Sequence, residues 1–263
     1  MISVEEIYNK IKNLADEKLA ENWDNVGILL GDKQQEVKNI LVCLDVTTDV
    51  VEEAISNNID LIISHHPLIF KAIKKLQFDD FKSNIIKNLI KNDISVISAH
   101  TNLDSAEFGL NQYLANILNL KNIDVLFKND NFSNAGLGRV GCLEKEMDLK
   151  TFISFVKSKF NLDYVKLISN DSQDKKINKV AILGGSGGSF IYTLPDVDIY
   201  LTGDVSYHEA QDSLEMGKTV LDIGHFSEIF CKDLLKNYLL KIYTSDELNI
   251  NLSKVEENPF KII

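Results

Sequence analysis

Four of the five histidines closely follow short apolar runs, and carboxylates accompany them. His65 and His66 follow the run DLIIS, His100 follows ISVISA, and His225 follows TVLDIG. Each run has the β-branched composition of a strand. In open parallel sheets, ligands bind beyond the carboxyl ends of the strands, so we expect these side chains at a functional edge. Imidazoles with carboxylates are ligands that Zn, Mn, Fe, Co and Ni prefer, which predicts a metal site.

The neighbouring pair His65 and His66 indicates more than one metal ion. Adjacent side chains on an extended strand project to opposite sides. Each histidine can therefore serve its own ion if the chain turns after the pair, and Pro67 favours such a turn. The interpretation is one ion per histidine.

Two carboxylates are spaced to share these ions. Glu228 stands three residues after His225 at the start of a helical segment, which puts both side chains on one face. If Asp104 or Glu228 bridges, two ions lie about 3.5–4 Å apart, the separation at which a bound hydroxide attacks a substrate. The sequence thus predicts a hydrolase with two divalent metal ions. The predicted ligands are His65, His66, Asp104, His225 and Glu228, and the predicted catalytic residues are Glu228 and His100.

The alternative interpretation of these residues is structural. A single histidine is more often a hydrogen-bonded core residue or a helix cap, and only the joint placement argues against this. His208 stands inside a helical run and is assigned no metal. His100 is either a ligand or a residue that orients one. Asp45 and Asp204 also follow strands, where each orients a ligand histidine or, more commonly, caps the next helix.

A glycine-rich loop, GGSGGS (184–189), follows the strand-like run KVAIL. Its backbone N–H groups and the next helix start can hold an anion such as a phosphate. The loop has neither the Lys-Ser/Thr pair of a Walker loop nor the glycine order of a dinucleotide site. A tight turn that needs glycine's backbone freedom is the alternative. The predicted substrate-binding residues are Gly185, Ser186, Gly187 and Gly188.

The elements that must position these residues form an α/β protein. Apolar runs alternate with helix-period segments, as in βα units on mostly parallel sheets. Six strands are predicted, in two groups of three: 40–45, 60–64, 94–99, 179–183, 198–202 and 219–223.

The two groups resemble each other, which indicates a weak internal repeat. DLIISHH (60–66) is similar in pattern to DIYLTGD (198–204), and SVISAHTNLD (95–104) to TVLDIGHFSE (219–228). A polar stretch, KNDNFSNA, lies between the halves and has the composition of a linker. Two similar α/β domains, 1–128 and 129–263, are expected, with the metal site between them and with the chain end packing back on the first.

Composition limits the partners and the compartment. The chain has 263 residues, with 28 Lys+Arg against 39 Asp+Glu, and its net charge of −11 disfavours general nucleic-acid binding. Cys43, Cys142 and Cys231 are odd in number and far apart, which indicates reduced thiols. No run approaches the roughly 18 apolar residues of a membrane span, and the N-terminus lacks a signal pattern. We expect a cytoplasmic protein.

Six motifs together resemble one known family over nearly the whole chain. They are ENWDNVGILLGD (21–32), LVCLDVT (41–47), SHHPLIF (64–70), SAHTNLD (98–104), AILGGSGGS (181–189) and DIGHFSE (222–228). The family is the Ngg-interacting-factor-three-like family, whose bacterial members are often labelled GTP cyclohydrolase 1 type 2 homologues. The resemblance implies a dinuclear site on the same five ligands and a ring-shaped homohexamer. Longer members carry a middle domain that this chain lacks.

The family label implies a reaction in which GTP and water give formate and dihydroneopterin triphosphate. The predicted substrate is accordingly a small nucleotide-like molecule. Two other functions remain open. The same metal pair suits a nucleotide phosphatase or phosphodiesterase, and the family name also allows a metal-binding interaction protein without turnover.

Overall fold

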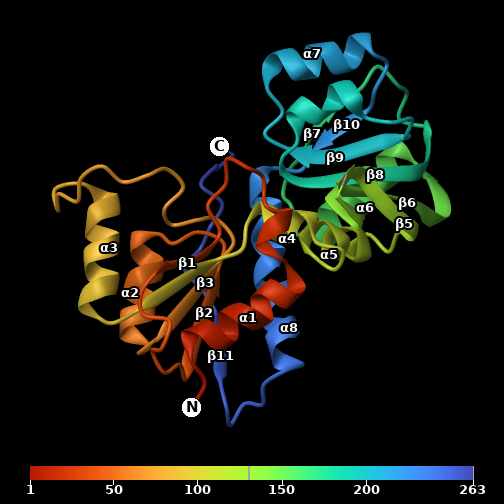
Figure 1. The fold of residues 1–263 in the computed structure, drawn as a ribbon. Helices are drawn as coiled ribbons and strands as arrows, with labels where there is room; N and C mark the ends of the chain where they lie inside the picture. The colour runs from red at the N-terminus through yellow and green to blue at the C-terminus, as the bar shows by residue number, and fades with distance from the viewer. Residues whose placement is uncertain (130, 263) are drawn as a thin grey trace. The chain divides into compact units, whose positions relative to one another are not determined.

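A computed structural model of the chain describes residues 1–129 and 131–262. Two compact units make up the chain, which crosses between them twice (Figure 1). Unit 1 consists of Met1–Leu103 and the C-terminal stretch that begins at Cys231, and unit 2 is Asp104–Phe230. In this described part, no helix has the length and apolar character required to cross a bilayer.

Unit 1 is built on a five-stranded sheet whose order is β1-β4-β3-β2-β11. β11, β2, β3 and β4 pair in parallel, and only β1 runs antiparallel, at the edge beside β4. The three inner strands are buried at every position but the first of β2, which is typical of strands covered on both faces. The strands are β1 (Gly27–Leu30), β2 (Asn39–Cys43), β3 (Leu61–Ser64), β4 (Ser95–Ser98) and β11 (Asn249–Leu252).

Helices cover both faces of this sheet. α2 (Thr48–Ser56) and α3 (Phe81–Lys91) lie on one side, and α1 (Val4–Leu14) and α8 (Cys231–Leu240) on the other (Figure 1). Alternate strand residues such as Leu41 face the core that contains the buried residues of α2 and α3. Two short helices complete the unit: η1 (Glu17–Leu19), and α4 (Thr101–Ser105), which carries the chain into unit 2.

Side-chain caps fix where the longer helices of unit 1 begin. The Ser3, Thr47 and Asp80 side chains accept hydrogen bonds from the first turns of α1, α2 and α3. Since α2 and α3 each begin beyond the strand that precedes them, the segments between strand and helix gather at the carboxyl edge of the sheet.

Unit 2 contains a mixed six-stranded sheet whose order is β5-β6-β8-β9-β10-β7. The β8–β9 and β9–β10 pairs are parallel, whereas the β5–β6, β6–β8 and β10–β7 pairs are antiparallel. The strands are β5 (Lys121–Asn129), β6 (Phe132–Asp148), β7 (Lys166–Ile168), β8 (Lys176–Ser186), β9 (Ile199–Gly203) and β10 (Val220–Asp222). The helices are α5 (Leu110–Ile117), α6 (Leu149–Phe160), η2 (Gly188–Thr193), α7 (Tyr207–Glu215) and η3 (His225–Phe230).

All six predicted strands exist, as β2, β3, β4, β8, β9 and β10, but two expectations about their arrangement are wrong. The sheets are mixed rather than mostly parallel, because the long strand β6 brings antiparallel pairing into unit 2. The division at 128/129 is also wrong, because β5 runs through it and pairs with β6. The polar stretch there joins two paired strands and is no linker; its Asp130 lies outside the described residues.

Candidate metal centre

Three histidines of unit 1 form a cluster at the carboxyl edge of its sheet. His65 and His66 follow β3, and His100 follows β4, the neighbouring parallel strand. One ring nitrogen of each lies within 4.8 Å of those of the other two. The ring centroids are 5.1–5.5 Å apart. His65 is fully buried, and the other two are half-buried.

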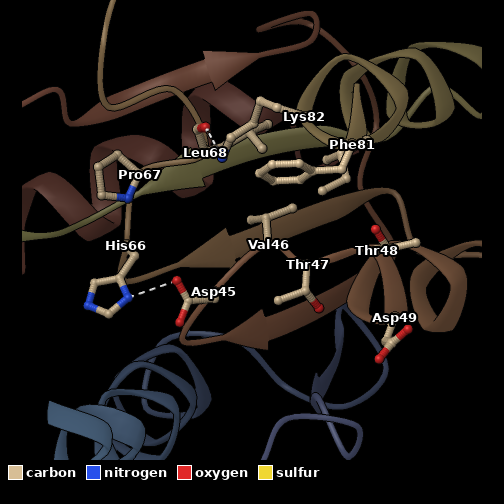
Figure 2. A pocket seen from close by; sticks show the side chains of 11 residues that line it. Asp45, Val46, Thr47, Thr48, Asp49, His66, Pro67, Leu68, Phe81 and Lys82 are labelled. Carbon is tan, nitrogen blue, oxygen red and sulfur yellow. Dashed lines mark hydrogen bonds and ion pairs between the residues drawn. The ribbon is translucent and has the colours of Figure 1, made fainter. Parts of the chain in front are cut away.

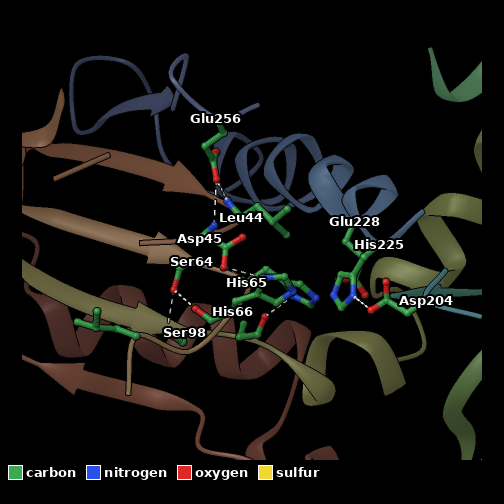
Figure 3. A network of polar contacts seen from close by, with 12 residues as sticks. Leu44, Asp45, Ser64, His65, His66, Ser98, Asp204, His225, Glu228 and Glu256 are labelled. Carbon is green, nitrogen blue, oxygen red and sulfur yellow. Dashed lines mark hydrogen bonds and ion pairs between the residues drawn. The ribbon is translucent and has the colours of Figure 1, made fainter. Parts of the chain in front are cut away.

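Each of these rings is held by its Nδ1 atom. His65 Nδ1 lies 2.8 Å from the Ala99 carbonyl oxygen. His66 Nδ1 lies 2.9 Å from Asp45 Oδ1, and His100 Nδ1 lies 2.9 Å from an Asp24 oxygen (Figure 3 shows the first two rings). Carbonyl and carboxylate oxygens accept, so each Nδ1 carries the proton and a metal would bind through Nε2. Metal-ligating histidines usually donate their other ring N–H to a carboxylate or carbonyl in this way, so the three Nε2 atoms fit a metal ion as ligands.

Asp24, to which no sequence pattern assigns a role, anchors His100. Its side chain is fully buried, and its second oxygen accepts from the Thr101 backbone N–H at 3.1 Å and hydroxyl at 2.5 Å. Burial opposes ionisation, but the hydrogen bonds from His100 and Thr101 outweigh it and lower the pKa of Asp24 to about 2. Asp24 is therefore a charged acceptor at neutral pH. Its only sequence signal is its place in the ENWDN motif.

The segment that carries Asp45 is fixed from the C-terminal end of the chain. Glu256 Oε1 accepts from the backbone N–H groups of Leu44 at 2.8 Å and Asp45 at 2.9 Å (Figure 3). Its other oxygen pairs with Lys232 Nζ at 2.9 Å, and both side chains are largely buried. Lys232 also donates to the Ser253 carbonyl. This network sets the position of Asp45, which in turn holds His66.

In unit 2, three candidate ligands come from two short helices. Asp104 lies in α4, and His225 and Glu228 lie in η3. His225 Nε2 is 3.0 Å from Glu228 Oε2, so the three-residue spacing does bring these side chains together. His225 Nδ1 lies 2.6 Å from Asp204 Oδ2, which repeats the carboxylate backing seen in unit 1. Asp104 and Glu228 are buried carboxylates, a costly arrangement unless cations or hydrogen bonds compensate.

Asn111 links the backbones next to the two carboxylates of unit 2. This fully buried residue of α5 donates from Nδ2 to the Asp104 carbonyl at 3.1 Å. Its Oδ1 accepts from the Gly184 N–H at 2.9 Å. Gly185, the next residue, has φ +68°, and a Cβ atom there would overlap the Glu228 carboxylate. The Glu228 carboxylate therefore fits against the end of β8 only because residue 185 is glycine.

Comparison with known proteins places this chain in a family. The model of Duf34/NIF3 (NGG1p interacting factor 3) matches residues 2–259. The chain belongs to the Duf34/NIF3 family. Two of its relatives are named "GTP cyclohydrolase 1 type 2 homolog". The Clostridium acetobutylicum protein is 36% identical, with 99% of each chain covered. The Clostridium perfringens protein is 35% identical, with 100% of each covered.

Solved structures of other proteins share the fold. A hypothetical protein from Staphylococcus aureus has a TM-score of 0.92 and 31% identity, covering 100% of this chain and 99% of that one. A Bacillus cereus protein related to NIF3 has a TM-score of 0.91 and 26% identity, with 100% of each chain covered. Reduced HcgD from Methanocaldococcus jannaschii has a TM-score of 0.80 and 31% identity, covering 95% and 97%.

The glycine loop of this Duf34/NIF3 chain is crowded by side chains. Gly185 and Ser186 end β8, and Gly187 precedes η2. A Cβ atom on Gly188 would meet the Glu209 carboxylate, just as one on Gly185 would meet Glu228. Two carboxylates beside the loop weaken the case for a bound phosphate. Substrate binding by Gly185, Ser186, Gly187 and Gly188 stays a prediction.

A pocket of about 390 Å³ opens beside His66 in unit 1. Asp45 and His66 lie toward one end and Thr48 and Asp49 toward the other, with Phe81 and Lys82 of α3 on the opposite wall, across from Val46 and Thr47 (Figure 2). Lys82 Nζ donates to the Leu68 carbonyl at 2.8 Å. Burial lowers the pKa of this amine, although Asp45 opposes the shift. His208 lies exposed on α7.

Proposed function

We propose that this chain is a metal-dependent hydrolase with two divalent ions. The observation that carries the proposal is the cluster of three imidazoles, each held through Nδ1 by a carboxylate or carbonyl. His65, His66 and His100 would present Nε2 to metal, as Zn, Mn, Fe, Co and Ni favour. Such ions would supply activation of water and stabilisation of negative charge during hydrolysis.

The proposed dinuclear site also uses Asp104, His225 and Glu228 of unit 2. Chain connectivity supports this extension, because both crossings between the units lie beside candidate ligands. Asp104 is the first residue after one crossing, and Glu228 stands two residues before the other. At the first crossing, Asp104 follows the unit 1 histidine His100 by only four residues. Glu228 is the residue we assign to proton transfer, together with His100 in the alternative in which His100 binds no metal, since a carboxylate and an imidazole can both carry a proton.

The proposed reaction is the one in the names of the relatives, GTP cyclohydrolase 1 type 2. GTP and water would give formate and dihydroneopterin triphosphate. Direct incubation tests this, because the pterin product is fluorescent and formate can be assayed enzymatically. Formation of both supports the proposal. Release of phosphate without formate would replace it with a two-metal phosphatase, and no turnover by a metal-loaded protein would leave a metal-binding interaction protein.

Elemental analysis tests the metal site itself. We expect purified protein to carry divalent metal that His65→Ala and Glu228→Ala lose in large part. His208→Ala is the matched control, because His208 is exposed and outside the cluster. Full metal content in both site variants would contradict the proposal. Homohexameric assembly and a cytoplasmic location stay predictions, and sedimentation analysis checks the first.

A further inference from the structure

Two aromatic side chains of unit 1 stand exposed beside the histidine cluster. Trp23 is 59% exposed and Phe70 is 45% exposed. Their ring centroids are 5.8 Å apart, and they lie 6.2 Å and 6.4 Å, respectively, from the ring centroid of His100. Large aromatic side chains are usually well buried, so a solvent-facing pair next to candidate ligands calls for a functional explanation.

The backbone around both rings is tied to the histidine cluster. Asp24, the residue after Trp23, accepts the hydrogen bonds of His100 and Thr101. Asn25 Nδ2 donates at 2.5 Å to the carbonyl of Ile69, the residue before Phe70. One short segment therefore orients a candidate ligand and holds both rings beside it.

We infer that Trp23 and Phe70 bind the planar heteroaromatic part of the substrate, a ring of purine size, next to the metal ligands. This inference rests on the proposed function. Aromatic faces stack on heterocycles of many kinds, and each stacked base contributes roughly a 10-fold to 100-fold gain in affinity.

The angles between the rings favour a small planar ligand over a protein surface. Trp23 and Phe70 meet at 69°, and they meet the His100 ring at 71° and 80°. The three rings thus form a corner and no continuous flat patch. A ring that stacks on one aromatic face can then present its edge to the neighbouring rings and place its polar atoms toward the histidines.

The test uses the fact that Trp23 is the only tryptophan of the chain. Tryptophan fluorescence of the zinc-loaded protein therefore reports on this corner alone. We expect GTP to quench it, and inorganic tripolyphosphate, which lacks a base, to leave it unchanged. In calorimetric titrations with GTP, Trp23→Leu should bind at least about 10-fold more weakly, and Trp23→Phe should retain most of the affinity. Phe260→Leu, at an exposed phenylalanine outside the corner, is the control.

Equal GTP affinity in wild type and Trp23→Leu would overturn the inference. So would a fluorescence shift that depends on protein concentration without any ligand, because a second copy would then cover Trp23. Elemental analysis of the same samples tests the proposed function separately. If metal is bound but GTP does not quench the fluorescence, the inference about Trp23 and Phe70 is overturned and the proposed function is not. If no metal is bound, the proposed function is overturned, and quenching by GTP still decides whether these two rings bind a heteroaromatic ligand.

Discussion

Asp24 accepts a hydrogen bond from His100 at 2.9 Å, although 76 positions separate the two residues in the sequence. The same relationship, a carboxylate against the Nδ1 atom of a candidate ligand, recurs for His66 with Asp45 and for His225 with Asp204. A carboxylate in this place fixes the tautomer and the ring orientation and makes the other nitrogen a better ligand. Three such pairs are the main structural support for a metal centre in this Duf34/NIF3 protein.

Removing the carboxylate behind His100 should weaken metal binding without removing a ligand. For Asp24→Ala we expect zinc affinity to fall about 10-fold to 100-fold, as measured in competition with a chromophoric chelator. Asp32→Ala, an exposed aspartate of the same unit, should leave the affinity unchanged. If both variants bind zinc like the wild type while their circular dichroism is native, His100 is not a ligand.

The Asn111 bridge should matter for both stability and metal binding. Asn111→Leu keeps the side-chain size but leaves the Gly184 N–H and the Asp104 carbonyl buried without this partner. Each unsatisfied group costs about 1–3 kcal/mol, so urea unfolding should show a clear loss of stability. Metal content should fall as well, because Asp104 and the backbone beside Glu228 lose their common support. Asn116→Leu, on the exposed side of α5, should change stability by no more than about 0.5 kcal/mol.

Two adjacent glutamates near the chain end should differ sharply in their effect on stability. Glu256→Ala removes the charged partner of the buried Lys232 amine and the acceptor of two backbone N–H groups, and we expect a loss of about 3–5 kcal/mol in the free energy of unfolding. Glu257 pairs with Lys261 at the surface at 3.9 Å, so Glu257→Ala should cost at most about 1 kcal/mol. Similar unfolding midpoints for the two variants would show that the Glu256 network is not important.

Removing the metal should lower the melting temperature of the protein, provided that the histidine cluster is intact. An ion that binds only the folded state at 100 times its Kd stabilises it by about 2.7 kcal/mol. Chelation should therefore lower Tm, and added zinc should restore it. The His65→Ala variant should show little of this shift, and His208→Ala all of it. A zinc response that survives in His65→Ala would place the stabilising ion elsewhere.

Much of the candidate site follows from local sequence patterns. A short apolar run bounded by turn residues is typical of a buried strand, so β3, β4 and β10 are predictable from those runs alone. The histidines then follow from the rule that ligands gather beyond strand ends. Asp24 and Asn111 were not among the predicted site residues. Asp24 lies in an irregular turn, 76 positions from its partner His100, and Asn111 lies at an ordinary helix position, 73 positions from its partner Gly184. Neither position carries a periodic signal that points to such a distant partner.

The sequence by itself determined the strands, the histidines that follow them and the three-residue spacing of His225 and Glu228, because these depend on short-range periodicity. Only the tertiary structure decided which strands pair and in which direction. It put β11 beside β2, across some 210 positions, and paired β5 with β6 where a linker was predicted. It also brought an exposed tryptophan to the side of His100. Pairing of distant segments is decided by which buried surfaces fit together, and no local pattern encodes that choice.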